Sequence, residues 1–317
     1  MDKIICVTGP TATGKTQLAV ALAKQYNGEV LSCDSMQLYR GMCIGTAAPT
    51  PAEMAGVRHH MLGVVDPSED FSVGRYVSMA DPILRDILAR GKTCVICGGT
   101  GLYLDSLMAG RDFAPAPSTG RREDLERMAD EQGIETVLEY LRTFDPESAE
   151  RLHPADRRRI LRAAEVYLET GKTITEHNRE TRAIPPKYTG AWIGLDFQDR
   201  AALYRRIYRR VIQLVEAGLL EEIESLLAQG VPKTATSLQA IGYKEPIAAL
   251  EGKCTMAEAV EAIARESRRY AKRQRTWFRR NPEIHWIVQA DPPVFSAVLD
   301  DAAQYLSNLG WIAQNPR

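Results

Sequence analysis

The sequence predicts an α/β fold in which a parallel sheet is flanked by helices and interrupted by an all-helical insertion. Over the first hundred residues, short apolar runs alternate with stretches of helical periodicity, a pattern typical of parallel sheets. The alternation stops near Pro115 and Pro117, and only helical periodicity follows until about Thr181. We therefore expect a core domain formed by residues 1–115 and 186–317, and a helical insertion domain formed by residues 116–185.

The individual elements follow from the spacing of apolar residues. Ser118, directly after the two prolines, is the expected N-cap of the first inserted helix. We predict strands at Ile4–Thr8, Glu29–Cys33, Thr93–Cys97, Trp192–Phe197 and His285–Gln289, and core helices at Lys15–Tyr26, Val73–Ala89 and Asp199–Gln229.

The composition is that of a folded globular chain. Of the 317 residues, 44% are hydrophobic and 26% are charged, which excludes a mostly disordered or collagen-like protein. No apolar run approaches the roughly 18 residues that span a bilayer, so we expect a cytoplasmic protein with no membrane segment and with its six cysteines reduced. The net charge of −1 neither demands nor excludes a polyanionic partner.

Residues 9–16 fit the phosphate-binding loop pattern G-x-x-x-x-G-K-[ST], between an apolar strand and a helical pattern. Glycines let backbone N–H groups turn around a phosphate, the lysine adds positive charge, and the threonine hydroxyl can bind Mg²⁺. The fold is therefore expected to be P-loop NTPase-like, with Thr16 as the candidate Mg²⁺ ligand. The predicted phosphate-binding residues are Gly9, Pro10, Thr11, Ala12, Thr13, Gly14, Lys15 and Thr16.

Asp34 is the candidate carboxylate beside this loop. Many P-loop enzymes place a metal-holding aspartate after an apolar strand, but the strand at Thr93–Cys97 ends in Gly98 and Gly99. Asp34 follows another predicted strand, and the carboxyl ends of parallel strands lie along one edge. It could hold a metal, act as a base, or cap a turn.

Basic residues gather in three helical segments. Any one of them is typical of a solvated helix face, but three in a near-neutral chain favour a nucleic-acid partner. The clusters are Arg265, Arg268, Lys272, Arg275 and Arg279 on one predicted helix face; Arg151, His153, Arg157, Arg158, Arg159 and Arg162; and Arg200, Arg205, Arg206, Arg209 and Arg210.

Two residue pairs resemble metal-ligand patterns. Cys94 and Cys97 have CxxC spacing, but they lie in a predicted strand and point to opposite faces. His59 and His60 are adjacent in an extended segment and have no further ligand nearby in the sequence. We interpret both pairs as structural.

Five ordered motifs closely resemble the bacterial tRNA dimethylallyltransferases, also called tRNA isopentenyltransferases. The resemblance runs over nearly the whole chain and is far more specific than the phosphate loop alone. The motifs are Gly9–Thr16, Asp34–Met42 with Ile44–Ala47, Gly98–Tyr103, Gln239–Glu245 and Tyr270–Arg279.

The resemblance implies transfer of a dimethylallyl group from dimethylallyl diphosphate to a tRNA. The acceptor is the N6 amine of the adenine 3′ of the anticodon (position 37), in tRNAs that read codons starting with U. The loop would then hold a diphosphate leaving group, with Mg²⁺, instead of a nucleotide. The resemblance also implies a monomer and an insertion that closes over the anticodon stem-loop.

The same resemblance assigns roles to residues of this chain. Asp34 would accept a hydrogen bond or proton from the adenine amine, and Lys15, Thr16 and Arg210 would stabilise the leaving diphosphate. Because Arg206 and Arg209 precede Arg210 in the same motif, the arginine that reaches the diphosphate stays open. The residues expected against tRNA are Asp34, Ser35, Met36, Gln37, Thr100, Arg122, Arg158, Arg159, Ile160, Leu161, Arg162, Gln239, Ala240, Ile241, Gly242, Tyr243 and Lys244, together with Lys272 and Arg275 of the basic helix.

Two alternatives remain at this stage. One is prenylation of a free adenine nucleotide, which the long insertion and the basic helix disfavour because a mononucleotide needs no such surface. The other is a small-molecule P-loop kinase or a nucleotide-dependent RNA-binding switch, which would bind ATP tightly and would not respond to dimethylallyl diphosphate.

Overall fold

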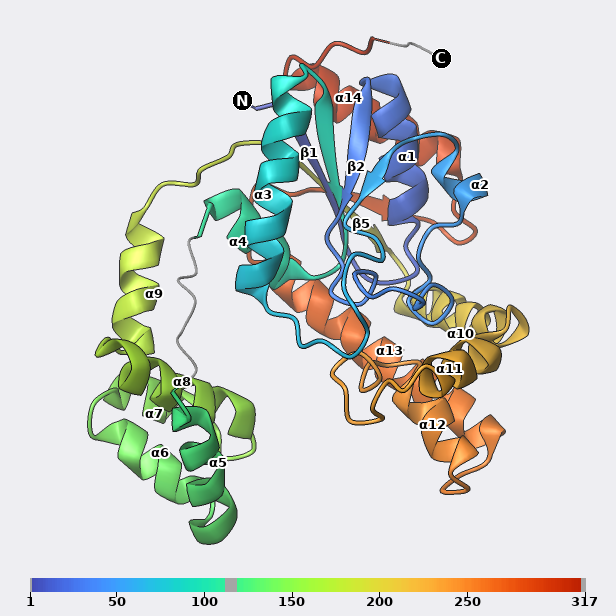
Figure 1. Ribbon diagram of the computed structural model, residues 1–317. Coiled ribbons are helices and arrows are strands. Elements are labelled where there is room, and N and C mark those ends of the chain that lie inside the picture. The colour runs from blue at the N-terminus through green and yellow to red at the C-terminus, as the bar shows by residue number, and fades with distance from the viewer. Residues whose placement is uncertain (1, 112–118, 315–317) are drawn as a thin grey trace. The chain divides into compact units, whose positions relative to one another are not determined.

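The computed structural model describes residues 2–111 and 119–314 (Figure 1). The chain divides into two compact units, Met1–Gly110 with Tyr188–Arg317, and Arg111–Lys187. The boundaries expected from the sequence, after residues 115 and 185, lie a few residues away from these divisions. The expected linker prolines Pro115 and Pro117 and the expected N-cap Ser118 fall outside the described residues.

The larger unit is built on a parallel sheet with strand order β3-β2-β4-β1-β5-β6. All five predicted strands are present, with bounds within a residue of those expected. The two-residue strand β3 is an addition, because its pairing with β2 is too short to produce an alternating pattern. The strands are β1 (Ile4–Thr8), β2 (Gly28–Ser32), β3 (His59–His60), β4 (Thr93–Cys97), β5 (Ala191–Phe197) and β6 (His285–Gln289).

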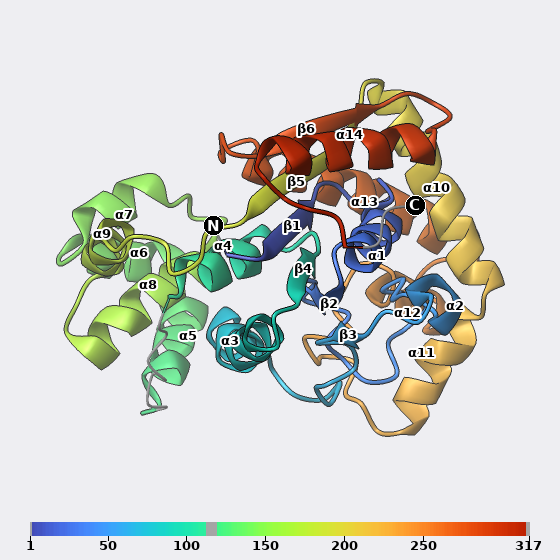
Figure 2. The same ribbon diagram turned by 90° about the horizontal axis from the view of Figure 1, so that it is seen from above.

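Helices cover both faces of this sheet (Figures 1 and 2). Leu18 and Leu22 of α1 pack with Leu306 of α14 against one face, and α3 packs against β2 and β4 on the other. This double cover explains why β1 is apolar at nearly every position and fully buried. The helices of this unit are α1 (Lys15–Gln25), α2 (Pro51–Met54), α3 (Val73–Ala89), α4 (Gly101–Ala109), α10 (Arg200–Glu216), α11 (Leu219–Ala228), α12 (Lys244–Leu250), α13 (Met256–Phe278) and α14 (Phe295–Asn308).

The prediction of a single helix over Asp199–Gln229 is wrong. The segment forms two helices, α10 and α11, which are separated at Gly218. Gly218 has φ of 101°, a left-handed conformation that glycine adopts at little cost and other residues resist. The apolar periodicity continues through the break, which is why the pattern alone did not reveal it.

The smaller unit is all-helical and has its own apolar core. Asp145 caps α7 by accepting the N–H of Ser148 at 3.1 Å, and it also accepts the hydroxyl of Thr175 at 2.7 Å. The helices are α5 (Arg121–Gln132), α6 (Ile134–Arg142), α7 (Pro146–Arg151), α8 (Arg157–Thr170) and α9 (Ile174–Ala183), and the core includes Leu125, Val137, Leu141, Ile160 and Leu161.

Across the part of the chain that the structure describes, no helix combines the length and the apolar character needed to cross a membrane.

Candidate active site

The phosphate loop connects β1 to α1 at the carboxyl edge of the sheet. Gly9 has φ of 131°, and a Cβ there would lie 2.3 Å from the carbonyl oxygen of Leu195 on β5. Gly14, with φ of 89°, is the N-cap of α1. Both glycines are therefore required by the backbone, one for a close approach to β5 and the other for the turn into the helix.

Lys15 folds back over the loop. Its Nζ donates a hydrogen bond to the carbonyl oxygen of Pro10 at 2.7 Å, and the Thr13 hydroxyl donates to the same oxygen at 2.9 Å. The pKa of Lys15 is lowered to about 8, chiefly by burial, with the charge of Arg210 acting in the same sense and Cys97 and Asp34 in the opposite sense. An anionic phosphate group would favour the protonated form.

Two buried glutamines hold the loop from distant parts of the chain. Gln274 of α13 accepts the N–H of Thr11 at 2.8 Å and donates to the carbonyl oxygen of Gly99 at 3.0 Å. Gln289 of β6 donates to the carbonyl oxygen of Thr13 at 3.0 Å. Neither glutamine is marked by a pattern in the sequence that predicts this role, although Gln274 lies within one of the five motifs.

Asp34 lies in the turn that follows β2. One carboxylate oxygen accepts the N–H of Met36 at 2.9 Å, so the capping role considered from the sequence is present. The next residue is also fixed, because the N–H of Ser35 donates to the Thr100 hydroxyl at 3.0 Å. The turn leaves the second carboxylate oxygen of Asp34 able to accept a proton or hydrogen bond from a substrate.

The sequence left open which of three arginines on α10 would reach the diphosphate, and the structure gives these arginines different surroundings. Arg210 lies beside the loop, with its Nη1 3.4 Å from the hydroxyl of Thr11, and burial lowers its pKa. Arg206 donates to the carbonyl oxygen of Ala12 at 3.0 Å and packs over a phenylalanine ring of β5. Arg209 is exposed. Of the three, Arg210 is the arginine that lines the pocket beside the loop.

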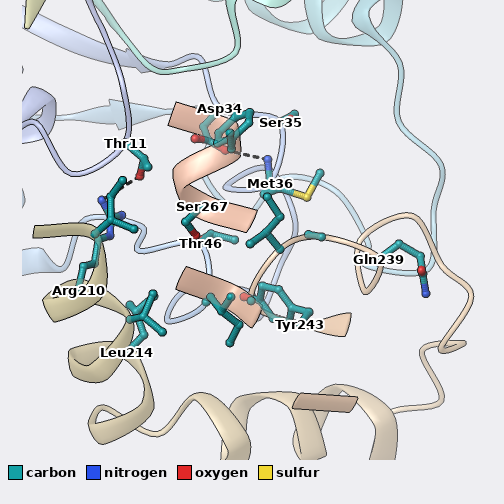
Figure 3. A pocket seen from close by; sticks show the side chains of 18 of the residues that line it. Thr11, Asp34, Ser35, Met36, Thr46, Arg210, Leu214, Gln239, Tyr243 and Ser267 are labelled. Atoms are coloured by element: carbon teal, nitrogen blue, oxygen red, sulfur yellow. Dashed lines mark hydrogen bonds between the residues drawn. The ribbon is translucent and has the colours of Figure 1, made fainter. Parts of the chain in front are cut away.

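A pocket of about 310 Å³ lies next to the phosphate loop and contains Asp34 (Figure 3). Thr11 and Arg210 line it near the loop, and the figure labels Tyr243 on a different side of the cavity from Asp34. Much of the wall is apolar. The apolar side chains that line it are Met36, Ile207, Val211, Leu214, Ala240, Ile241 and Ile263.

Five of the six residues from Gln239 to Lys244 line the pocket, and Lys244 is the exception. Gln239 and Lys244 are exposed, whereas Tyr243 is fully buried. Gln37, another residue expected against tRNA, uses its side-chain amide within the protein, where it donates to the carbonyl oxygens of residues 46 and 47.

The expectation that Ile160 and Leu161 contact tRNA is wrong for their side chains. Ile160 is 0% exposed and Leu161 is 2% exposed, and both belong to the apolar core of the smaller unit. Their neighbours Arg158, Arg159 and Arg162 are exposed on α8. The motif was carried over as a continuous run, whereas a helix with 3.6 residues per turn directs only one of its faces inward, and that face includes both Ile160 and Leu161.

The basic residues predicted on one face of α13 lie on a single continuous helix, but they have different surroundings. Lys272 is exposed, but the Nε of Arg275 lies 2.8 Å from a carboxylate oxygen of Asp196, which is buried at the end of β5. Arg279 lies 3.7 Å from the same oxygen. Arg275 therefore compensates a buried charge, and its guanidinium is not free in the way that the Lys272 ammonium is.

The histidine pair and the cysteine pair that resemble metal-ligand patterns both lie in strands of the sheet. His60 contacts the buried carboxylate of Glu29 at 2.8 Å, and His59 hydrogen-bonds the carbonyl oxygen of Val57 at 2.9 Å. Cys94 and Cys97 are free thiols in β4. Within residues 2–111 and 119–314, no group of three or more histidine, cysteine, aspartate or glutamate side chains could hold a metal ion.

The fold and the site define a P-loop α/β protein in which a phosphate loop and a carboxylate face one small, largely apolar pocket. Residues 37–281 match the family described as IPP transferase, and residues 2–65 match the family described as isopentenyl transferase. The chain belongs to the IPP transferase family.

Individual relatives resemble the chain over nearly its whole length. It is 43% identical over 307 residues to the tRNA dimethylallyltransferase of Caldanaerobacter subterraneus subsp. tengcongensis, covering 96% of this chain and 98% of the relative. It is 44% identical over 308 residues to the enzyme of the same name from Geobacillus thermodenitrificans, covering 96% of each.

Two solved structures with related names also match the chain. The full-length tRNA isopentenylpyrophosphate transferase of Bacillus halodurans matches with a TM-score of 0.73 and 39% identity, over 97% of this chain and 96% of that one. A eukaryotic dimethylallyltransferase acting on tRNA matches with a TM-score of 0.81 and 28% identity, over 100% of this chain and 82% of that one.

Proposed function

We propose that this protein transfers a dimethylallyl group from dimethylallyl diphosphate to the N6 amine of adenine 37 in tRNAs that read codons starting with U. The observation that carries the proposal is the pocket in which Thr11 and Arg210 lie near the phosphate loop, and which Asp34 also lines. One cavity can therefore hold both a diphosphate ester and an amine acceptor. The named relatives act on tRNA and support this choice of acceptor.

The donor end of the pocket suits a leaving diphosphate. When the bond between the allylic carbon and the diphosphate oxygen breaks, the electron pair leaves with the diphosphate and negative charge accumulates there. Lys15, Arg210 and the N-terminal end of α1 supply positive potential at this place. The apolar wall, which includes Val211, Leu214 and Ile263, suits the five-carbon hydrocarbon chain and excludes water from the reacting carbon.

The acceptor end requires Asp34. The adenine amine is a weak nucleophile that must be directed at the allylic carbon, and it loses a proton as the new carbon–nitrogen bond forms. The second carboxylate oxygen of Asp34 accepts a hydrogen bond from this amine and then its proton. The hydrogen bond with Met36 keeps the carboxylate in a fixed orientation throughout.

We also propose Mg²⁺ as a partner of the diphosphate. The Thr16 side chain is partly exposed at the start of α1, and no described residue hydrogen-bonds its hydroxyl. An oxygen ligand of this kind fits Mg²⁺, which takes much of its coordination from phosphate oxygens and water. When bound, the ion would neutralise charge on the diphosphate.

The surface residues proposed to hold tRNA are those that remain exposed. Lys272 on α13, Gln239 and Lys244 beside the pocket, and Arg158 and Arg159 on α8 can reach an external phosphate backbone. We propose that the protein acts as a monomer in the cytoplasm.

The identity of the donor is tested by a product assay with an unmodified tRNA as the acceptor. The protein is incubated with Mg²⁺ and dimethylallyl diphosphate or ATP, and both diphosphate release and nucleoside mass are measured. We expect diphosphate release and one dimethylallyl adenosine per tRNA with dimethylallyl diphosphate only. Release of the ATP γ-phosphate, without any response to dimethylallyl diphosphate, would show a kinase or a nucleotide-dependent switch instead.

A further inference from the structure

Glu222 of α11 fixes one wall of the pocket although it does not line the cavity. Its carboxylate accepts the backbone N–H groups of three consecutive residues, Cys43 at 2.8 Å, Ile44 at 2.7 Å and Gly45 at 3.0 Å. It also accepts the hydroxyl of Tyr243 at 2.7 Å. One side chain therefore joins two segments that are far apart in the sequence.

Both segments form the wall of the pocket. Gly45 and Tyr243 line the cavity, as do their neighbours Thr46 and Gly242. The two segments are packed tightly, since a Cβ on Gly45 would lie 2.5 Å from the ring of Tyr243. A small movement of the loop at residues 43–46 would therefore shift the buried tyrosine and the shape of the cavity with it.

The chemistry of this contact makes Glu222 hard to replace. An ionised carboxylate accepts on both oxygens and so can satisfy three amides and a hydroxyl together, through charge-assisted hydrogen bonds. A glutamine presents one accepting oxygen and one donating NH₂ group, and the NH₂ group would face either backbone N–H groups or the phenol. Few other side chains can hold all four donors at once.

We infer that Glu222 is a positioning residue for the acceptor: it holds Gly45 and Tyr243 in the wall of the cavity that Asp34 also lines, where the adenine is proposed to bind, an inference that rests on the proposed function. The donor end of the pocket has separate supports. Gln274 and Gln289 hold the phosphate loop, and neither contacts the loop at residues 43–46 through a hydrogen bond of the described chain. Loss of Glu222 should therefore affect the acceptor and spare the donor.

The test compares Glu222→Gln with Glu224→Gln, a matched change of an exposed glutamate on the same helix. With an anticodon stem-loop as acceptor, we expect Glu222→Gln to lower kcat/KM for RNA by about 10- to 100-fold. We expect the Kd for a non-reactive dimethylallyl diphosphate analogue to stay within twofold of wild type. Tyr243→Phe, which removes one of the four donors, should give a smaller loss, and Glu224→Gln none.

A second readout does not depend on the reaction. Hydrogen exchange at the amides of residues 43–45 should be at least tenfold faster in Glu222→Gln than in wild type or Glu224→Gln, because these amides lose their acceptor. Equal exchange in all three proteins would overturn the inference. So would an equal loss of donor affinity and of kcat/KM for RNA, which would indicate general damage. A wild-type protein that modifies no RNA would reject the proposed function and the acceptor role with it, while the exchange rates would still show whether Glu222 fixes the loop.

Discussion

The Oε1 atom of Gln274 accepts the backbone N–H of Thr11 at 2.8 Å, which ties the long helix α13 to the phosphate loop. The same side chain donates to the carbonyl oxygen of Gly99 after β4. A Cβ on Gly99 would lie 2.1 Å from the Gln274 amide nitrogen, so the glycine is needed for this contact. Gln274 thus holds two of the loops at the carboxyl edge of the sheet in fixed relation.

Replacing Gln274 by leucine should destabilise the fold and weaken donor binding. The substitution removes the partner of the partly buried N–H of Thr11 and of the buried carbonyl of Gly99, and each such loss costs up to about 1–3 kcal/mol. We expect the free energy of unfolding in urea to fall by about 2–4 kcal/mol, and affinity for a dimethylallyl diphosphate analogue to fall in folded protein. Gln304→Leu, at an exposed position of α14, serves as the control. Unchanged donor affinity in folded Gln274→Leu would show that the loop does not depend on this contact.

The Asp34→Asn variant removes the proposed chemical role of Asp34 and keeps its role in stabilising the turn. The asparagine side-chain oxygen can still accept the N–H of Met36, so the turn is retained, but the amide cannot accept a proton. We expect single-turnover alkylation of a stem-loop to slow by about 10²- to 10⁴-fold, the range for loss of a general base, with RNA affinity within a few-fold of wild type. An alkylation rate of Asp34→Asn equal to that of wild type would show that the Asp34 carboxylate takes no part in the reaction.

Donor binding should weaken as the pH rises above 8. Burial lowers the pKa of Lys15 to about 8, so the free protein loses this positive charge as the pH passes that value. Since the bound diphosphate favours the protonated lysine, the Kd of a non-reactive donor analogue should rise by up to about tenfold per pH unit above 8, and titration of Lys15 should not change it below pH 7. Lys15→Met should bind weakly at all pH values and lack this dependence. A wild-type profile that parallels that of Lys15→Met would assign the titration to another group.

Lys272 and Arg275 should respond differently to alanine although they are neighbours on α13. Lys272→Ala should weaken binding of a stem-loop and reduce the slope of log K against log salt by about 1, because one phosphate contact is lost. Arg275→Ala should mainly destabilise the fold, by about 3 kcal/mol, since it leaves the Asp196 carboxylate buried with Arg279 as its remaining partner. Equal effects of the two variants on the salt slope would show that Arg275 contacts RNA as Lys272 does.

The sequence predicts the local parts of this site well. The phosphate loop is specified by a short glycine pattern between a strand and a helix, and Asp34 follows directly from the end of β2. The division near residues 115 and 185 is visible because proline and helical periodicity are also local signals. In each case, the residues that determine the structure are close together in the chain.

The features of the site that the sequence did not predict depend on contacts between residues that are far apart in the chain. Gln274 and Thr11 are 263 positions apart, and Glu222 and Cys43 are 179 positions apart, so no periodic pattern connects them. Arg275 looks like any other basic residue of its helix until the fold brings Asp196 beneath it. Burial of Ile160 could have been predicted, because helical periodicity already places it on the apolar face of α8.

The most direct test of the account is the choice of acceptor. Labelled dimethylallyl diphosphate is offered with an unmodified anticodon stem-loop, the same stem-loop with inosine in place of adenine 37, and AMP. We expect label only in the stem-loop that carries the adenine amine, and loss of that label in Asp34→Asn. Label in AMP would instead indicate prenylation of free nucleotides, and label in the inosine stem-loop would contradict transfer to the amine.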